Sequence, residues 1–339
     1  MSVIQKPHIR DVAEMAGVSV GTVSNVLNRP DVVAVATRQR VQAAVAALRY
    51  VRNESARQLR NGQSRTIGLI VPDIANPFFT DVARGVEDVT SAAGAMVIVC
   101  NSDNDEGKED VYLTMLAEQQ VLGVLHVPVG RPAAAVARLN DRNIPVVLLD
   151  YNARSRQQCS VSVNDVAGGQ LAVAHLLAND RRRLAFVGAG SSALRQIVDR
   201  LAGAHRAMAA AGRPTQDLSL LPPTTLNVAG GVASARALLA LPTKRRPDAV
   251  VCVNDLLAIG MLQEFVRNGV RVPDDVAIVG YDDIAFAAAA AIPLTSVRQP
   301  RNQLGRRAAE LLIDEALGDD HTHARVVFEP ELIIRESSG

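Results

Sequence analysis

Apolar side chains near the start of the chain recur at helical spacing in two short runs. From Ile9 to Ala16 the spacing fits two turns of helix, and Gly17 then supplies the permissive backbone that a sharp turn requires. Ser19 is a suitable N-cap for a second helix, which the pattern predicts over residues 20–27. The side chains predicted to face inward are Val12, Ala13, Ala16, Val18, Val23, Val26 and Leu27. The residues predicted to face outward are Ser19, Gly21, Thr22, Ser24, Asn25 and Asn28.

A third helix is predicted within residues 35–50, where Thr37 is placed to cap it. Val41, Val45 and Leu48 repeat at helical spacing and would close a small core with the first two helices. Two short helices at a steep angle are typical of a helix-turn-helix unit. The small polar face of the second helix leaves nothing bulky or acidic to prevent its entry into a DNA major groove. The apolar pattern alone also fits other three-helix units.

The distribution of charge favours the DNA-binding interpretation. Residues 1–65 carry ten basic and four acidic side chains, a net charge of +6, whereas the rest of the chain carries −5. A basic head on an acidic body is typical of a protein whose head meets a polyanion, although a solvated terminal extension would show the same charge. Arg29, Arg38 and Arg40 lie beside the predicted helices, and arginine commonly contacts phosphates.

After Arg65 the chain alternates short β-branched runs with longer amphipathic segments. Near-continuous apolar strands separated by helices predict buried parallel sheets. Their number and length suit two doubly wound lobes, with a ligand crevice beyond the carboxyl ends of the strands. The fold class is therefore α/β. The predicted strands lie in TIGLIVP, AMVIVCN, VLGVLHVP, IPVVLLD, RLAFVGAG, PDAVVCVND and VAIVGYDD.

Polar and aromatic residues follow several of these predicted strands, at the edge where the crevice would lie. For any single polar residue, a role as helix N-cap is favoured over a ligand contact. Together they predict a ring of hydrogen-bonding groups around the mouth of the crevice. The residues are Asp73, Asn76, Phe78, Phe79, Asp150, Asn254, Asp255, Asp282 and Asp283.

Composition places the chain among globular proteins with more than one domain. The 339 residues exceed the usual size of a single core, and 48% of them are hydrophobic against 21% charged. The longest apolar stretches are too short to span a bilayer and the N-terminus has no secretion signal, so a cytoplasmic location is expected. The three cysteines, Cys100, Cys159 and Cys252, lack zinc or redox spacing, and we expect buried thiols.

Two short motifs suggest cofactors that the rest of the sequence does not support. Residues 186–193, FVGAGSSA, match a dinucleotide fingerprint, but the acidic residue expected about 20 positions later is missing. His321 and His323 are close together, but no third metal ligand with suitable spacing is evident, so a solvated loop is predicted there. No residue lies in a context that marks a nucleophile or base. We therefore predict no cofactor, no metal and no enzymatic activity, with a nucleotide-dependent oxidoreductase as a remaining alternative.

Residues 9–64, IRDVAEMAGVSVGTVSNVLNRPDVVAVATRQRVQAAVAALRYVRNESARQLRNGQS, resemble the DNA-binding head of the LacI/GalR (lactose-repressor) family. The resemblance implies that Val20, Gly21 and Asn25 read base edges. It places phosphate contacts at Ser19, Thr22, Ser24 and Asn28, near which Arg29 also lies. Asparagine pairs bidentately with adenine and valine contacts a thymine methyl, whereas glycine has no side chain to read with, so modest direct readout is expected.

Residues 53–64, NESARQLRNGQS, read as a linker on composition alone. By resemblance they form a hinge helix when two subunits lie on an operator. Ala56 would pack between the two hinges, and Leu59 would enter the minor groove as an apolar wedge. The family usually has proline before this segment, where this chain has Arg52.

Residues 66–335 also resemble this family, and hence the type I periplasmic sugar-binding-protein fold. The matching segments include IGLIVPDIANPFF, DRLAGAHRAM and VPDDVAIVGYDDI. The resemblance implies that Phe78 and Phe79 wall an effector, that Arg200 clamps it, and that Asn254 and Asp282 hydrogen-bond it. Two positions depart from the family, because Asn164-Asp165 replaces Asp-Asn and Leu226 stands where an aromatic wall is common. Asn164 is still predicted to contact the effector, for which a sugar is the expected class.

These observations predict a repressor that binds a near-palindromic double-stranded DNA operator as a homodimer and responds to a small-molecule effector. The resemblance implies that the dimer forms through surface helices of the N-lobe, with residues 111–120 and the helix after Asn76 as contributors. The alternative is a cytoplasmic small-molecule-binding or sugar-modifying protein with a basic head. The predicted divisions are 1–52 for the helix-turn-helix domain, 53–65 for the hinge, and 66–339 for the effector-binding domain. Within the last, the N-lobe comprises 66–163 and 294–325, and the C-lobe 164–293 and 326–339.

Overall fold

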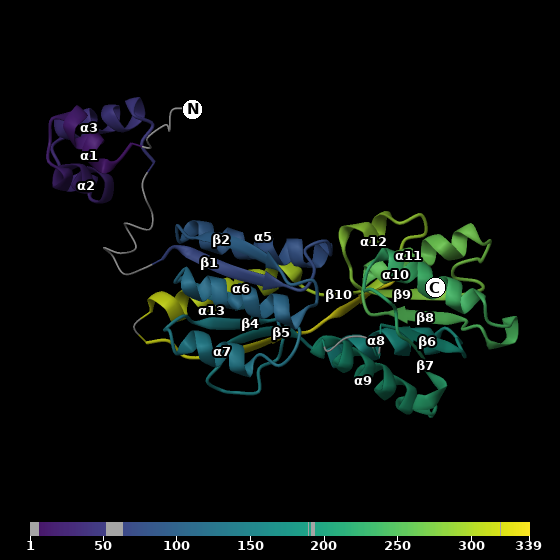
Figure 1. Ribbon diagram of the computed structural model, residues 1–339. Helices are drawn as coiled ribbons and strands as arrows, with labels where there is room; N and C mark the ends of the chain where they lie inside the picture. The colour runs from purple at the N-terminus through teal and green to yellow at the C-terminus, as the bar shows by residue number, and fades with distance from the viewer. Residues whose placement is uncertain (1–6, 52–63, 189, 191–193, 319) are drawn as a thin grey trace. The chain divides into compact units, whose positions relative to one another are not determined.

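The computed structural model describes residues 7–51, 64–188, 190, 194–318 and 320–339. The chain divides into two compact units, residues 1–63 and 64–339 (Figure 1). Among the described residues, none of the helices combines the length and the apolar character that a membrane-spanning segment needs.

The first unit is a three-helix bundle, with α1 at Ile9–Ala16, α2 at Val20–Asn28 and α3 at Val35–Ala47. Gly17 ends α1 with a φ of 63°, a left-handed conformation that favours glycine. The Ser19 side chain caps α2 by accepting a hydrogen bond from the Thr22 N–H. The prediction that Thr37 caps α3 is wrong, because the helix begins two residues earlier, after Ala34. The buried core consists of Val12, Ala13, Ala16, Val23, Val26, Val41 and Ala44.

The second unit contains two six-stranded sheets, one in each lobe. The first, in the N-lobe, has the order β11-β5-β4-β3-β1-β2, and the second, in the C-lobe, has the order β12-β10-β9-β8-β6-β7. All paired strands run parallel except β12, which is antiparallel to β10. The N-lobe strands are β1 (Thr66–Val71), β2 (Met96–Asn101), β3 (Gly123–His126), β4 (Val146–Leu149), β5 (Ser160–Val163) and β11 (Arg325–Phe328). The C-lobe strands are β6 (Leu184–Val187), β7 (Ser219–Leu221), β8 (Ala249–Cys252), β9 (Ala277–Asp282), β10 (Thr295–Arg298) and β12 (Glu331–Ile333).

Helices pack on both sheets, as the alternation of strand and helix predicts (Figure 1). The N-lobe helices are α5 (Pro77–Ala92), α6 (Glu106–Glu118), α7 (Ala133–Asn140) and α13 (Arg301–Leu317). The C-lobe helices are α8 (Asp165–Ala178), α9 (Arg195–Ala210), α10 (Val228–Leu239), α11 (Asp255–Arg267) and α12 (Ala285–Ala289). The seven strands expected from the apolar runs are all present, and the α/β fold class is confirmed.

The chain crosses between the lobes three times, and two of the predicted crossing points are wrong. Strand β10 pairs with β9 in the C-lobe, so the chain returns to the N-lobe after residue 298 rather than at 294. Strand β11 pairs with β5 in the N-lobe, so the last crossing follows residue 328 rather than 325. Strand β10 is largely buried, whereas β11 alternates exposed and half-buried residues at the edge of its sheet, and neither pattern identifies the lobe to which the strand belongs.

One pair of glycines brings α8 and α9 close enough together to position the cleft. A Cβ atom on Gly169 would collide with the carbonyl oxygen of Arg200, and one on Gly203 would collide with that of Val166. Glycine is therefore required at both positions for the two helix backbones to meet. This contact sets the start of α8, at Asp165, beside the middle of α9, where Arg200 lies.

Candidate functional site: an inter-lobe cleft and a DNA-reading helix

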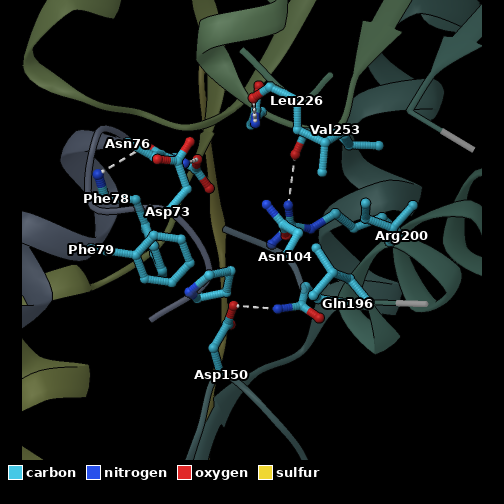
Figure 2. A pocket seen from close by; sticks show the side chains of 15 residues that line it. Asp73, Asn76, Phe78, Phe79, Asn104, Asp150, Gln196, Arg200, Leu226 and Val253 are labelled. Atoms are coloured by element: carbon cyan, nitrogen blue, oxygen red, sulfur yellow. Dashed lines mark hydrogen bonds between the residues drawn. The ribbon is translucent and has the colours of Figure 1, made fainter. Parts of the chain in front are cut away.

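A pocket lies between the two lobes, at the carboxyl ends of the parallel strands, and its cavity volume is about 50 Å³ in this arrangement (Figure 2). This location is the one expected for ligands in open α/β folds. Five of the six predicted effector residues line it: Phe78, Phe79, Arg200, Asn254 and Asp282. The other lining residues are Pro72, Asp73, Asn76, Asn104, Asp150, Leu194, Gln196, Ile197, Leu226 and Val253.

Arg200 is buried in the C-lobe wall and is held on three sides. Its Nε donates a hydrogen bond to Asp165 Oδ1 (2.7 Å) and its Nη1 donates to the carbonyl oxygen of Val253 (2.6 Å). The guanidinium carbon lies 3.7 Å from the centre of the Tyr281 ring, and the Tyr281 hydroxyl donates to the same Asp165 oxygen (3.0 Å). Because these contacts fix the guanidinium before any ligand binds, Arg200 offers a pre-oriented cation to the cleft.

Two carboxylates extend into the cleft from strand ends whose backbone is left-handed. Asp150 follows β4 with a φ of 52°, and Asp282 ends β9 with a φ of 103°. Burial raises the pKa of Asp150 to about 8, and the nearby charge of Asp165 adds to this effect. Burial also raises the pKa of Asp282 to about 6, against the opposing effect of the Arg200 cation. Both groups therefore change protonation state close to neutral pH.

Two hydrogen bonds, which we call the lobe-bridging bonds, connect the lobes across the cleft. Gln196 Nε2, on α9 of the C-lobe, donates to Asp150 Oδ2 of the N-lobe (2.8 Å; Figure 2). Asn76 Nδ2, at the start of α5 in the N-lobe, donates to Asp282 Oδ2 of the C-lobe (3.3 Å). Any rotation that opens the lobes must break both bonds, so they stabilise the present arrangement.

The bridged residues also contain polar atoms that have no partner. Asp150 Oδ1 and Gln196 Oε1 are buried and make no hydrogen bond within the described part of the chain. An unpaired polar atom in a buried position costs about 1–3 kcal/mol, so these atoms favour a ligand that pairs with them. They lie in the wall of the pocket, where a bound molecule would meet them.

The apolar side of the cleft is formed unequally by the two lobes. Phe78 and Phe79 pack edge to face in the N-lobe, with ring centres 5.0 Å apart. The C-lobe contributes the aliphatic residues Leu194, Ile197 and Leu226 instead of a facing ring. A ligand would therefore have aromatic contact on one side only.

Asn164 does not line this pocket, and neither do two of the acidic residues in the predicted ring. Asn164 lines an adjoining pocket, which shares Asp150 and Gln196 with the cleft. Its side chain caps α8 and donates to Glu329. Asp255 is fully buried and accepts hydrogen bonds from the Ser296 hydroxyl and the Ile284 N–H. Asp283 forms ion pairs with Arg298 and Arg335. Neither Asp255 nor Asp283 is a helix N-cap, because Asn254 caps α11 and Ile284 precedes α12.

Sequence reasoning missed Gln196, although a signal for it was present. Arg200 was assigned to the cleft, and residues four apart on a helix share one face, so the spacing places Gln196 beside it. Asp165 and Tyr281 were also missed as partners of Arg200, because they come from different elements, α8 and β9.

In the first unit, the outward face of α2 presents the residues predicted to read DNA. Val20, Gly21, Asn25 and Asn28 are exposed on it. The Ser19 and Thr22 hydroxyls lie 2.9 Å apart, and Asn28 donates to the Ser24 hydroxyl (3.2 Å). Arg29 is exposed immediately after the helix. Ala56, Leu59 and the neighbouring Arg52 lie outside the described residues.

Comparison with known proteins shows which families and relatives this chain resembles. Residues 8–53 match the family described as bacterial regulatory proteins, lacI family, and residues 173–338 match the periplasmic binding protein-like domain. The HTH-type transcriptional repressor PurR of Photobacterium profundum is 37% identical over 334 residues, which are 97% of this chain and 98% of that protein.

Solved structures resemble the chain over nearly its whole length. The lac repressor dimer bound to operator and the anti-inducer ONPF has a TM-score of 0.83 at 26% identity, covering 98% of this chain and 99% of that one. A complex of the transcriptional regulator CelR with cellobiose has a TM-score of 0.71 at 32% identity, with coverage of 98% and 99%.

A helix-turn-helix head followed by two parallel-sheet lobes around a cleft defines a transcription regulator with an effector-binding domain. The chain belongs to the LacI family of bacterial transcriptional regulators.

Proposed function

We propose that this protein is a repressor that binds a near-palindromic operator as a homodimer, and that a small hydroxylated effector in the cleft controls its affinity for DNA. The observation that carries the proposal is the pair of lobe-bridging bonds, Gln196–Asp150 and Asn76–Asp282. Because both bonds cross the cleft, a ligand that binds there would change the angle between the lobes.

The chemistry of the lining favours a neutral ligand that is rich in hydrogen-bond donors. Asp73 and Asp282 outnumber the single cation, Arg200, which Asp165 already neutralises, while Asp150, with a pKa of about 8, is mostly uncharged at neutral pH. An acidic effector would meet net negative charge, whereas hydroxyl groups would satisfy the unpaired oxygens. Phe78 and Phe79 offer a surface for the apolar face of a sugar ring. The complexes of CelR with cellobiose and of an Enterococcus faecium regulator with ribose support this class.

Effector control follows from linkage between the cleft and the DNA-bound state. A ligand that replaces the lobe-bridging bonds stabilises one angle between the lobes over another. A coupling free energy of about 1–3 kcal/mol would change operator affinity about 5- to 150-fold. The sign of the effect depends on which lobe angle the operator complex favours.

On the DNA side, we assign the reading of base edges to Val20 and Asn25, with Gly21 allowing close approach of α2. Ser19, Thr22, Ser24, Asn28 and Arg29 are assigned to phosphate contacts, as their exposure or partial exposure permits. Ala56 and Leu59 are assigned to the hinge, where Leu59 would act as a minor-groove wedge.

Dimerisation is assigned to an apolar surface of the N-lobe. Strand β2 is an edge strand of the first sheet and exposes Met96 and Ile98. Helix α6 exposes Val111 and Met115, each more than half accessible. Exposed apolar groups of this size are typical of protein interfaces.

A fluorescence-anisotropy titration with duplexes from the upstream region of its own gene tests the proposal, at fixed salt and with a panel of sugars, nucleosides and small acids. We expect sequence-dependent binding of two chains per duplex and a change in affinity with a neutral hydroxylated compound. Binding that is equally tight for all duplexes and unaffected by any compound would support the alternative of a small-molecule-binding protein with a basic head. Of the motif behind the oxidoreductase alternative, residues 189 and 191–193 lie outside the described residues.

A further inference from the structure

Four side chains with metal-binding chemistry converge in the N-lobe, one of them distant in the sequence from the other three. Cys159 immediately precedes β5, Glu315 lies in the last turn of α13, and His321 and His323 lie in the segment between α13 and β11. One ligand atom from each of the four lies within 4.8 Å of all the others. The sequence predicts a solvated loop at the two histidines because no third ligand is evident from spacing. The fold supplies two more, Glu315 from the preceding helix and Cys159 from a distant segment.

The distances between these atoms are close to the edges of a metal-centred tetrahedron. Cys159 Sγ lies 3.1 Å from His321 Nε2 and 3.6 Å from His323 Nδ1. Glu315 Oε2 lies 3.5 Å from His321 Nε2 and 3.9 Å from His323 Nδ1. With zinc–ligand bonds of about 2.0–2.3 Å, tetrahedral ligands are separated by about 3.3–3.6 Å. These four separations therefore differ from tetrahedral values by a few tenths of an ångström, and all four ligand atoms lie within 4.8 Å of one another.

The surrounding groups orient these ligands as they do in known metal sites. His321 Nδ1 lies 2.7 Å from Asp314 Oδ2, so its Nδ1–H donates to the carboxylate and its Nε2 lone pair points to the cluster. The backbone N–H of Ala324 donates to Cys159 Sγ (3.4 Å). Glu315 Oε2 is buried and accepts no hydrogen bond within the described residues. A buried carboxylate oxygen without a donor favours a cation at this position.

We propose that Cys159, Glu315, His321 and His323 bind one Zn²⁺ ion in a tetrahedral site. Thiolate, imidazole and carboxylate in this number and geometry favour zinc over magnesium or calcium, which prefer six or more oxygen ligands. Four protein ligands leave no open position for a substrate, so the site is structural rather than catalytic.

The place of the site in the fold indicates what the ion would stabilise. Because the N-lobe strands are parallel, the start of β5 lies at the same sheet edge as the start of β1, where the chain enters this unit. The ion would join that edge to the end of α13 and to the segment leading into β11 (Figure 1). At its other end, α13 begins with Arg301, which binds the carbonyl oxygens of Asp282 and Asp283 at the cleft. Zinc would therefore anchor a helix that extends from the effector cleft to the opposite edge of the lobe.

Cobalt substitution of the full-length, untagged protein tests this proposal without depending on the effector or the operator. After EDTA treatment, we expect one Co²⁺ to bind per chain, with the intense visible bands of a tetrahedral site and a near-ultraviolet thiolate-to-cobalt band. Zn²⁺ should displace the cobalt and raise the thermal unfolding midpoint. Asp314→Asn should weaken metal affinity about 10- to 100-fold while the bands keep their shape, because it removes only the group that orients His321.

Matched variants separate the site from non-specific binding. Cys159→Ser should lose the thiolate band, whereas Cys100→Ser, at another buried thiol of the same lobe, should keep it. His323→Ala, at a more exposed ligand, provides a second test if Cys159→Ser does not fold. Failure of the native chain to form a tetrahedral cobalt complex, or a thiolate band that survives in Cys159→Ser, would overturn the proposal.

Discussion

Asp150 shows how a single residue gives the cleft its sensitivity to pH. Its carboxyl group is buried, accepts one hydrogen bond from Gln196 and lies near the charge of Asp165. Its pKa is about 8 in the folded protein and about 3.9 in an unfolded chain. Between these values the folded protein binds more protons than the unfolded one, so this group reduces stability as the pH rises from about 4 to about 8.

We expect Asp150→Asn to remove this loss of stability. The amide oxygen still accepts the Gln196 hydrogen bond and carries no charge to desolvate. Between pH 6 and pH 8, the free energy of unfolding of the native protein should fall by up to about 1.4 kcal/mol per pH unit through this group, and that of the variant by much less. Thermal or urea unfolding across this range measures the difference.

Asp275→Asn serves as the control, because its carboxyl is exposed and Arg271 lowers its pKa to about 2. Its contribution is lost only as the pH falls below about 4, so the slope between pH 6 and pH 8 should remain that of the native protein. An equal slope in the native protein and in Asp150→Asn would contradict the assignment.

At the scale of the element, α2 combines two kinds of DNA contact that mutation should separate. Asn25→Ala should reduce discrimination at one base pair by about 1–3 kcal/mol and leave non-specific binding nearly unchanged. Arg29→Ala should weaken binding to all sequences and reduce the dependence of log affinity on log salt concentration by about one unit. Anisotropy titrations at several salt concentrations, with operator and scrambled duplexes, distinguish the two. The assignment fails if both variants lose specific and non-specific binding in the same proportion.

The close contact between helices α8 and α9 leads to a second prediction at the scale of the element. Gly203→Ala should destabilise the protein by about 1–3 kcal/mol, because its Cβ would collide with the carbonyl oxygen of Val166 and force the helices apart. Arg200, on the same helix, would move away from Asp165, so effector affinity should fall as well.

Gly107→Ala, in α6, is the matched control. Its added Cβ meets only Asp105 Oδ1, at 3.1 Å, and this oxygen, which caps α6, must shift by a few tenths of an ångström. The higher helix propensity of alanine opposes that cost, so stability should change by less than about 1 kcal/mol. Urea unfolding of the two variants compares them. Equal effects would show that the helix contact is not tight.

At the scale of the whole molecule, the exposed apolar groups of the N-lobe predict where two chains meet in the dimer. Met115→Glu places a charge in the proposed dimer surface and should shift the protein toward monomers, with a large loss of operator affinity. Sedimentation or light scattering at micromolar concentration measures this shift. Val266→Glu, a similar change at an exposed valine of α11 in the C-lobe, should leave the dimer intact. If the dimer tolerates Met115→Glu but not Val266→Glu, the interface lies in the C-lobe and the assignment is wrong.

The sequence predicted this fold well where local pattern decides it. Apolar periodicity located α1, α2 and seven strands, because burial of one face or of both faces leaves a clear signal. It placed β10 in the N-lobe and divided β11 between the lobes, because the lobe of a strand depends on which sheet edge is free after the earlier strands have paired.

The same distinction applies to the sites. Five effector residues assigned by resemblance line the cleft, whereas Asn164, the sixth, caps α8 and lines an adjoining pocket. The four proposed zinc ligands were not found together, because Cys159 and the two histidines are more than 160 positions apart in the sequence and Glu315 has no metal-binding motif around it.

The three crossings between lobes have a consequence for synthesis on the ribosome. Helix α13 and strand β11 complete the N-lobe but follow the C-lobe strands from β6 to β10 in the sequence. The first lobe therefore stays unfinished until those strands have been translated, while the three-helix bundle, whose core is self-contained, precedes both lobes. A stop codon between β10 and α13 would consequently leave the N-lobe without its last helix and strand and spare the DNA-reading bundle, giving fragments that retain a basic bundle without ligand control.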